Sequence, residues 1–525
     1  MRVEAGRRPV PSVDRIILLI LDLLLLGFAL NLTLQPLVEP DFGWHLRAGL
    51  DLVAHGWTVP DTDPYSHTMP DWRWVEHAWL TDGLLGLLYL GLEPAGALGV
   101  ILFFGIVTAL AWWIAAGQAS VPRTYRLAAM VASLWVALPF LGARTQLISL
   151  LGVAVLLRIW RQIQRGRRQW IWVLPALFVC WANLHGGFTA GLFLSGVLIF
   201  GALLERICAD SWPALAASLD EPVLAWEDLR QVVLALGIAA VLTWLNPYGW
   251  RLYVEIYDSL MDRYMIETLR EWQPVSFQGW AGQAYGFYLA GLAFVVVGWY
   301  RRVEPVRWLM LAVLLALSLL HWRNITLFLI VSVPLVAELL PLATATCLQW
   351  VPALKTYATV ILLAFTIVAS SGLFLLGPEH VSHVWRAGTS PQDYFEQSDY
   401  PIEAVRWIRS HHEEIGTRLY NDYGYGGFLL WQLPGEKIFI DGRMPAWRIG
   451  DRRIFQDYMD LNREHSPEIS ILDRYRVDWA LIPRGSGLAL ALESHPLWKV
   501  LYADGKAVIL RRQEQVDGHG RESLR

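Results

Sequence analysis

Long apolar stretches alternate with short polar connections along most of this chain. A helix needs about 20 apolar residues to cross the ~30 Å hydrocarbon core of a bilayer. About eleven stretches approach that length, so the pattern predicts an α-helical polytopic membrane bundle of about 11 spans, within a range of about 10 to 12. The predicted spans are residues 15–34, 95–117, 127–141, 147–159, 170–182, 187–206, 230–246, 284–300, 307–320, 325–345 and 356–376.

The positions of the arginines predict how these spans are oriented. Cytoplasmic loops of membrane proteins carry an excess of Lys and Arg. Arg2, Arg7, Arg8 and Arg15 precede the first span, which places the N-terminus in the cytoplasm. Alternation then places the arginine-rich segment 158–168 inside as well, although that segment did not define the topology. The segments predicted to face outward are residues 35–94, 142–146, 183–186, 246–283, 321–324 and everything after about 377.

The hydropathy pattern changes to that of a soluble domain after residue 376. Strands alternate with helices over residues 377–512, which favours a small extracytoplasmic α/β domain with a partly parallel sheet. The expected strands are 417–421, 437–441, 479–483, 498–503 and 507–511, and the expected helices are 401–410, 428–433, 453–463 and 467–475. The charged residues 513–525 are expected to be disordered. The chain is thus predicted to consist of a bundle over 1–376 and an outer domain.

The first outer loop, residues 35–94, is long enough to hold structure of its own. Apolar positions between Trp44 and Val53 indicate a helix along the membrane interface, with Asp41 as its N-cap. A turn-rich stretch with Asp63 follows, and a second amphipathic helix is expected over about 73–92. Ordering such a loop costs conformational entropy, so we expect it to line a site.

Composition excludes several classes of protein. Apolar residues make up 55% of the 525 residues, charged residues 17%, and the mean hydropathy is +0.37, which argues against a soluble globular protein. No P-loop, dinucleotide-binding glycine motif, HExxH motif or serine nucleophile elbow is present. ATP-driven transport, dinucleotide redox chemistry and zincin proteolysis therefore lose support. Membrane lipids are expected as partners, whereas nucleic acids are not.

Asp41 and His45 stand four residues apart, so on a helix they share a face. A carboxylate beside an imidazole can act as a general base or hold a divalent cation. Helix capping by Asp41 is the alternative that needs no chemistry.

Three further polar residues of the first outer loop carry the same ambiguity. Asp63 precedes Pro64, which turn chemistry alone explains, although a substrate or metal role is open to it. Glu76 and His77 stand between two tryptophans, where either can contact a sugar. The aromatic belt of a membrane interface explains them equally well.

Polar residues also mark the predicted outer ends of several spans. Arg144 and Arg323 can each clamp a phosphate with paired hydrogen bonds, or reach towards lipid headgroups. Asn183 and His185 offer hydrogen bonds to a substrate, or belong to a tight helical hairpin. Together with Asp41, these residues are predicted to line one cavity at the outer mouth of the bundle.

Two motifs of the outer domain follow predicted strands. Residues 421–427 come after one strand, and Asp441 to Arg443 end another. Ligands favour the carboxyl ends of parallel strands, so the two motifs can form a site. A contact between Asp441 and Arg443 that braces the domain is the interpretation we favour.

The combination resembles the GT-C superfamily of polytopic membrane glycosyltransferases, and within it a poorly characterised bacterial branch. The resemblance covers most of the chain and rests on an acidic residue after the first span, interfacial helices, the bundle and the outer domain. Its motifs are residues 41–46, 63–66, 181–186 and 439–443. The chain departs from the oligosaccharyltransferases in having Asn421-Asp422-Tyr423 where they have Trp-Trp-Asp, which argues against a protein acceptor.

The resemblance implies a sugar transfer from a polyprenyl-phosphate or polyprenyl-diphosphate donor to an extracytoplasmic glycan, lipid or protein acceptor. It implies Asp41 as base or metal ligand, Asp63 as second choice, and Arg144 and Arg323 as holders of the donor phosphate. The expected cofactor is a divalent cation, Mg²⁺ or Mn²⁺, held by Asp41 and His45. The expected location is the bacterial inner membrane. A lipid or glycan transporter, a flippase and a non-catalytic scaffold are the alternatives.

Overall fold

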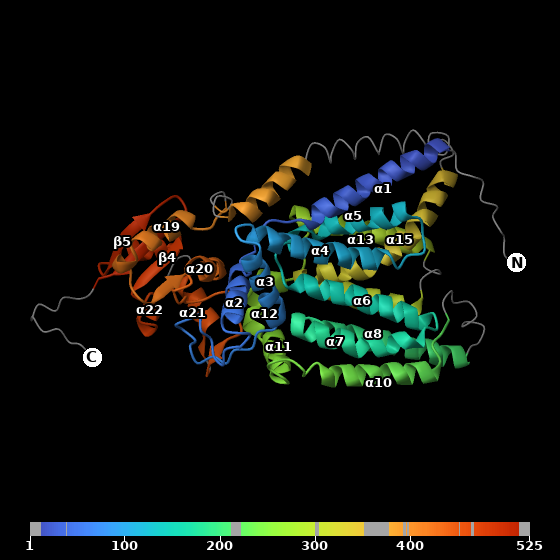
Figure 1. Ribbon diagram of the computed structural model, residues 1–525, viewed down its shortest axis with the longest axis horizontal. Helices are drawn as coiled ribbons and strands as arrows, with labels where there is room; N and C mark the ends of the chain where they lie inside the picture. The colour runs from blue at the N-terminus through green and yellow to red at the C-terminus, as the bar shows by residue number, and fades with distance from the viewer. Residues whose placement is uncertain are drawn as a thin grey trace, which may run out of the picture. The chain divides into compact units, whose positions relative to one another are not determined.

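The computed structural model describes residues 12–37, 39–211, 222–299, 304–350, 377–391, 395, 398–450, 452–463 and 467–513 (Figure 1). The chain divides into two compact units. Unit 1 comprises Met1–Pro36, Ile101–Asn246 and Arg270–Trp385, and unit 2 comprises Leu37–Val100, Pro247–Leu269 and Arg386–Arg525. Unit 2 therefore joins the first outer loop to the C-terminal region.

Unit 1 is a helical bundle, as the apolar pattern predicts. Its elements are α1 (Ser12–Thr33), α4 (Gly96–Ala116, whose first turns belong to unit 2), α5 (Arg123–Ala137), η1 (Leu138–Phe140), α6 (Gln146–Gln164), η2 (Arg168–Trp172), α7 (Val173–Leu184), α8 (Phe188–Ser211), α10 (Trp226–Leu242), η3 (Arg270–Trp272), α13 (Trp280–Trp299), α14 (Pro305–Leu320), η5 (Trp322–Asn324) and α15 (Ile325–Trp350). In Figure 1, α6, α7, α8 and α10 run side by side.

Each predicted span within the described residues is helical. Among those residues, six helices are long and apolar enough to cross a membrane: Arg15–Thr33, Gly96–Ala116, Gln146–Gln164, Phe188–Ser211, Trp280–Trp299 and Trp322–Thr346. Pro305–Leu320 is a shorter apolar helix. The predicted span 356–376 lies outside the described residues, as does the tail after residue 513. A multi-pass membrane bundle is confirmed, and the number eleven stays a prediction.

Unit 2 begins with two helices of the first outer loop, α2 (Phe42–Ala54) and α3 (Trp79–Gly91), which pack against each other. The backbones approach so closely that a Cβ on Gly49 would lie 1.9 Å from the Asp82 carbonyl oxygen. The apolar face of α2 was expected along the membrane interface. That face is buried within unit 2, where Trp44, Leu46 and Leu52 are less than a tenth exposed, because α3 and α20 cover it. The position of α2 along the membrane interface stays a prediction.

The remaining helices of unit 2 are short. They are α11 (Arg251–Met261), α12 (Arg263–Thr268), α19 (Ile402–Ser410), η6 (His412–Glu414), η7 (Tyr423–Tyr425), α20 (Gly426–Gln432), α21 (Ile454–Leu461), α22 (Ser470–Arg474) and α23 (Gly487–Glu493). Four of the C-terminal helices, α19 to α22, correspond to those predicted from the sequence.

The C-terminal sheet is mixed, which confirms a small α/β arrangement. Its strands are β1 (Leu419–Asn421), β4 (Trp479–Pro483), β5 (Trp498–Ala503) and β6 (Ala507–Arg512), in the order β1-β4-β6-β5. β1 runs parallel to β4, and the other pairs are antiparallel. A two-stranded ribbon pairs β2 (Arg448–Ile449) with β3 (Arg452–Arg453). The aromatic-rich core of unit 2 lies against this sheet and includes Tyr420, Phe439 and Trp498.

The segment 437–441, predicted as a buried strand, is buried from Ile438 to Asp441 but does not join the sheet. Its backbone pairs with the first outer loop: the Ile438 amide donates to the Tyr65 carbonyl at 3.0 Å, and the Ile438 carbonyl accepts from the His67 amide at 3.1 Å. The Asn421 side chain accepts a hydrogen bond from the Phe439 amide and donates one to the Ile440 carbonyl, each at 2.8 Å. Long-range partners therefore take the place of a neighbouring strand.

His67 is one of the links between the first outer loop and β1. Its Nε2 bonds to the Leu419 carbonyl at 2.7 Å, and burial lowers the pKa of the imidazole to about 4. The folded protein therefore binds fewer protons than the unfolded chain between about pH 4 and pH 6.5. The stability that depends on a neutral His67 is therefore fully present above pH 6.5 and is lost as the pH falls towards 4.

We expect the substitution His67→Gln to reduce this acid sensitivity, because the Gln amide can still donate to Leu419 but does not titrate. A pKa shift of this size corresponds to a loss of about 3 kcal/mol in the free energy of unfolding between pH 6.5 and pH 4. Because the ring is partly exposed, we expect a loss of about 1–2 kcal/mol. Thermal unfolding of the purified protein at pH 5 and pH 7 measures the difference. An equal loss of Tm on acidification in both proteins would contradict the assignment.

Candidate acidic pocket

Three titratable side chains of the first outer loop converge inside unit 2. His45 lies on α2, Glu76 precedes α3, and Asp82 lies in the first turn of α3. One ligand atom from each lies within 4.8 Å of the others, and all three residues are buried. The shortest contact joins His45 Nδ1 to Asp82 Oδ1 at 2.7 Å. We call these residues the acidic cluster.

Burial governs the protonation of the acidic cluster. It raises the pKa of Glu76 to about 8, with a further rise from the nearby Asp82 carboxylate. Burial also raises the pKa of Asp82 and lowers that of His45. These directions all favour neutral forms, because a dry surrounding penalises charge. The cluster can therefore accept or release protons near neutral pH.

A cavity of about 310 Å³ opens beside Glu76 and Asp82. Four aromatic side chains line it, namely Tyr65, Trp74, Trp79 and Tyr248. Asp51 adds a third carboxylate, whose Oδ2 accepts a hydrogen bond from the Tyr65 hydroxyl at 2.9 Å. No Lys or Arg is among the described residues that line it. We call this cavity the acidic pocket.

Beside the acidic pocket, Arg443 joins the two motifs that sequence analysis placed far apart. Its Nη1 donates to Asp63 Oδ1 at 2.8 Å, its Nε donates to Asp441 Oδ2 at 2.8 Å, and its Nη2 forms an ion pair with the same oxygen at 2.7 Å. The side chains of all three are at most 5% exposed. Burial alone would lower the pKa of Arg443, but the two carboxylates hold it above its usual range. We call this arrangement the Arg443 ion triad.

The surroundings of the Arg443 ion triad fit a structural role. The guanidinium carbon lies 5.2–5.8 Å from the ring centroids of Trp44, Tyr65, Trp74 and Trp447. Asp63 also accepts hydrogen bonds from the amides of Tyr65 and Ser66, as an aspartate that shapes a turn does. These contacts already engage Asp63, the second choice for the base.

Asp41 lies outside the acidic cluster. Its Oδ1 accepts a hydrogen bond from Trp44 Nε1 at 3.2 Å, and its carboxylate lies against Gly442, where a Cβ would come within 1.8 Å of Oδ1. Asp41 occupies the N-cap position of α2 without a capping hydrogen bond from its side chain. Among the described residues, His45 groups with Glu76 and Asp82 as possible metal ligands, and a metal site at Asp41 and His45 stays a prediction.

The remaining predicted site residues occupy helix ends. His77 is 37% exposed, and its Nδ1 lies 3.6 Å from Glu76 Oε1 in unit 2. In unit 1, Arg323 pairs with Glu271 at 3.1 Å and lies over the Trp272 ring at 4.4 Å. Arg144 follows Gly142, whose φ of +125° suits glycine. Since Asp41 belongs to unit 2 and these arginines to unit 1, one shared outer cavity stays a prediction.

Two more predicted residues lie where α7 meets α8. His185 Nδ1 lies 2.8 Å from Ser149 Oγ, which in turn accepts a hydrogen bond from Trp181 Nε1 at 2.9 Å. Asn183 Nδ2 donates to the Leu245 carbonyl at 2.9 Å. These contacts match the tight helical hairpin that was the alternative to a substrate role.

Sequence reasoning missed Asp82 and Tyr248. A lone carboxylate in the apolar segment 79–91 was the available signal, since such a residue is rarely buried without a use. Tyr248 lies at the start of the segment Pro247–Leu269 of unit 2. Its place in the acidic pocket follows from the pairing of distant segments within unit 2.

The acidic cluster fits a divalent cation by its chemistry. One imidazole and two carboxylates form a ligand set that such ions bind. Asp82 Oδ2 is buried and has no hydrogen-bond partner among the described residues, so it can serve as a ligand atom.

The chain has the fold of the GT-C glycosyltransferases, as the resemblance implies. It is similar to the archaeal oligosaccharyltransferase AglB from Archaeoglobus fulgidus, solved with an inhibitory peptide and a dolichol-phosphate. The TM-score is 0.51 at 11% identity, over 97% of this chain and 75% of AglB. It is also similar to apo ArnT from Cupriavidus metallidurans, with a TM-score of 0.50 at 13% identity, over 95% of this chain and 98% of ArnT. A scan against protein-family models gives no match, and neither does a search of curated proteins.

We expect Arg443→Met to destabilise unit 2, because the change leaves two buried carboxylates without their cation. Breaking a buried ion pair from one side costs about 3–5 kcal/mol. Thermal unfolding and trypsin cleavage of the purified protein measure the loss. The exposed Arg448→Met serves as control, and the triple variant with Asp63→Asn and Asp441→Asn should recover part of the stability. A single variant as stable as the control would contradict the ion triad.

Proposed function

We propose that this protein transfers a sugar from a polyprenyl-phosphate or polyprenyl-diphosphate donor to an acceptor on the extracytoplasmic side of the bacterial inner membrane. One observation carries the proposal: a protein with the GT-C fold contains a buried acidic cluster that opens into a cavity of small-molecule size. The dolichol-phosphate bound to AglB supports a lipid-linked donor. The predicted topology places the N-terminus in the cytoplasm and the C-terminal region outside.

The acidic pocket is the proposed sugar site. Its volume lies at the lower end of the ~300–1,000 Å³ typical of ligand pockets. Trp74 and Trp79 offer flat apolar faces for a pyranose ring, and the carboxylates accept hydrogen bonds from its hydroxyls. Because three carboxylates and no described Lys or Arg line it, the pocket favours uncharged or amine-bearing sugars over uronic acids.

Asp82 is the proposed general base. Its Oδ1 is engaged by His45, whereas its buried Oδ2 has no hydrogen-bond partner among the described residues, and the residue lines the acidic pocket. Burial raises the pKa of Asp82, which makes its ionised carboxylate a stronger proton acceptor than an ordinary aspartate. The acceptor hydroxyl attacks the anomeric carbon and gives its proton to Asp82. The bond from that carbon to the donor oxygen breaks, and the electron pair leaves with the lipid phosphate.

His45 and Glu76 are the proposed positioning residues. His45 holds Asp82 in place, and Glu76 sets the local charge through its own protonation. Mg²⁺ or Mn²⁺ would be held by His45, Glu76 and Asp82, where its positive charge would offset the carboxylates and stabilise the leaving phosphate. Asp41, which the family resemblance favours, is the alternative base, with Asp63 behind it.

Arg144 and Arg323 are the proposed holders of the donor phosphate, assisted by Asn183 and His185. Guanidinium groups bind phosphate through paired hydrogen bonds, and both arginines lie beside ends of apolar helices. A polyprenyl tail can lie among those helices while its phosphate stays at their end.

Transfer of radiolabelled sugar from a panel of polyprenyl-phosphate sugars, measured with the purified full-length protein, tests the assignment. We expect Asp82→Asn to lower kcat by 10²-fold or more, because positioned bases contribute about 10²–10⁴-fold. The Michaelis constant for the donor should change little. Exposed Asp71→Asn is the matched control and should keep wild-type activity.

The same assay separates Asp82 from Asp41 as the base. A kcat that collapses in Asp41→Asn but survives in Asp82→Asn would move the base to Asp41. Wild-type protein that transfers no sugar from any donor of the panel would remove the glycosyltransferase proposal. In that case, donor flipping between the leaflets of proteoliposomes would test a lipid transporter.

A further inference from the structure

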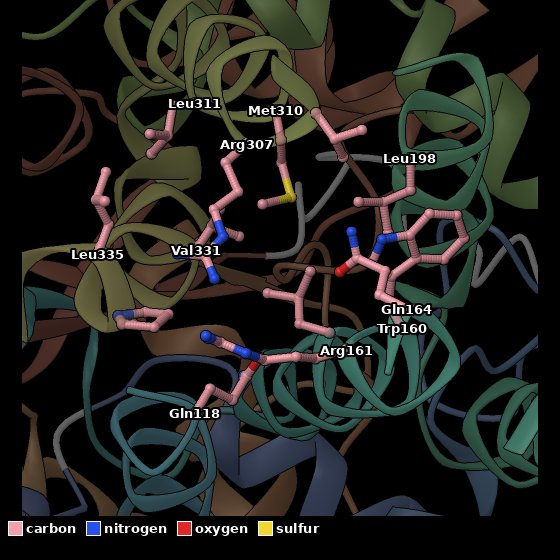
Figure 2. Close-up of a pocket in the computed structure, with 13 residues that line it drawn as sticks. Gln118, Trp160, Arg161, Gln164, Leu198, Arg307, Met310, Leu311, Val331 and Leu335 are labelled. Carbon is pink, nitrogen blue, oxygen red and sulfur yellow. The ribbon is translucent and has the colours of Figure 1, made fainter. Parts of the chain in front are cut away.

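A second cavity lies within unit 1 and is lined by residues that the proposed function does not use. Its volume is about 40 Å³, and it lies between α6, α14 and α15 (Figure 2). The polar side chains that line it are Gln118, Trp160, Arg161, Gln164 and Arg307. Each of them can donate hydrogen bonds, and no carboxylate is among the described residues that line the cavity. We call it the donor-lined cavity.

Two of these donors are buried without an acceptor. Trp160 Nε1 and Gln118 Nε2 have no hydrogen-bond partner in the part of the chain that the structure describes. Trp160 is only 5% exposed, and Figure 2 shows its indole nitrogen on the side of the ring that faces the cavity. A buried N–H group without an acceptor is destabilising, so these donors indicate a ligand with acceptor oxygens.

The two arginines are held in fixed positions at the cavity wall. Arg161 Nη1 bonds to Glu338 Oε1 at 2.9 Å, and Arg307 Nη1 bonds to Glu338 Oε2 at 2.6 Å. Arg307 Nε also forms an ion pair with Glu304 Oε2 at 2.6 Å. The two glutamates do not line the cavity. They therefore orient the guanidinium groups and leave the lining composed of donors and apolar side chains.

We propose that the donor-lined cavity binds the phosphate group of a membrane phospholipid. Its volume of about 40 Å³ exceeds the ~10–15 Å³ that a cavity needs to hold one water and is far below the ~300 Å³ at the lower end of small-molecule pockets. Guanidinium and N–H donors bind phosphate oxygens strongly. Leu198, Val306 and Leu311 are among the apolar residues of the lining and can contact acyl chains, which inorganic phosphate lacks.

The position of the cavity along the helices supports a lipid headgroup. Trp160 and Arg161 lie in the last turns of α6, and Arg307 lies in the first turn of α14. These helix ends are predicted to be cytoplasmic, so the ligand would come from the inner leaflet. The site is distinct from the arginines proposed to hold the donor phosphate.

Native mass spectrometry of the purified full-length protein tests the proposal. The probes are dihexanoyl phosphatidic acid, dihexanoylglycerol, which lacks the phosphate, and inorganic phosphate. We expect one phosphatidic acid per chain, bound at least tenfold more tightly than dihexanoylglycerol. If inorganic phosphate displaces phosphatidic acid, the site binds phosphate and the free ion is also a possible ligand. If inorganic phosphate does not displace it, the site is assigned to the lipid.

Variants locate the binding. Trp160→Phe keeps the ring but removes the N–H donor, so it should weaken phosphatidic acid binding about tenfold, the value of one hydrogen bond to a charged group. Gln118→Leu should act in the same direction. Both changes leave the ion pairs of Arg161 and Arg307 intact. Trp172→Phe, at a tryptophan that is 51% exposed, is the control and should bind as the wild type does.

Two results would overturn the proposal. One is that the wild type binds phosphatidic acid and dihexanoylglycerol equally well, or binds neither of them. The other is wild-type affinity in both Trp160→Phe and Gln118→Leu. Thermal unfolding of each variant without lipid separates a lost ligand contact from a lost fold, because only the latter lowers Tm in the absence of the probe.

Discussion

The Arg443 ion triad is the constraint on which the organisation of unit 2 depends. Buried charge is tolerated only where it is paired and hydrogen-bonded, and Arg443 meets that condition with one aspartate from the first outer loop and one from the C-terminal region. The aromatic rings around the guanidinium exclude water, which strengthens both contacts. Two segments separated by more than three hundred residues are thereby held together, and α2 and α3 become part of a folded unit instead of a peripheral loop.

The same triad explains the electrostatics of the acidic pocket. Arg443 is committed to Asp63 and Asp441, so its positive charge reaches His45 and Glu76 only as a secondary influence. Glu76 and Asp82 are left in a dry environment in which burial dominates their pKa values. The two groups of carboxylates therefore differ: one is neutralised by Arg443, and the other is the group that we propose to exchange protons with a substrate.

The sequence predicted the features that depend on local pattern. Apolar periodicity located the described helices of unit 1, and the alternation of strands and helices located β1, β4, β5 and β6. The sequence did not predict the contacts between distant segments. Residues 437–441 have the composition of a strand, yet their hydrogen bonds go to Tyr65, His67 and Asn421, which no local signal specifies. Asp82 was overlooked for a related reason: its partner His45 lies on another helix, so their proximity exists only after α2 and α3 pack.

The cost of the acidic cluster argues that it is retained for use. Burying two carboxylates and an imidazole within 4.8 Å of one another, with Asp82 Oδ2 unpartnered among the described residues, opposes folding. Apolar side chains of similar size at these positions would pack into the core of unit 2 without that penalty. Proteins commonly accept such local instability where a site must bind or react, and compensate for it elsewhere. Here the compensation is adjacent, because the ion triad and its aromatic surroundings stabilise the same unit that carries the cluster.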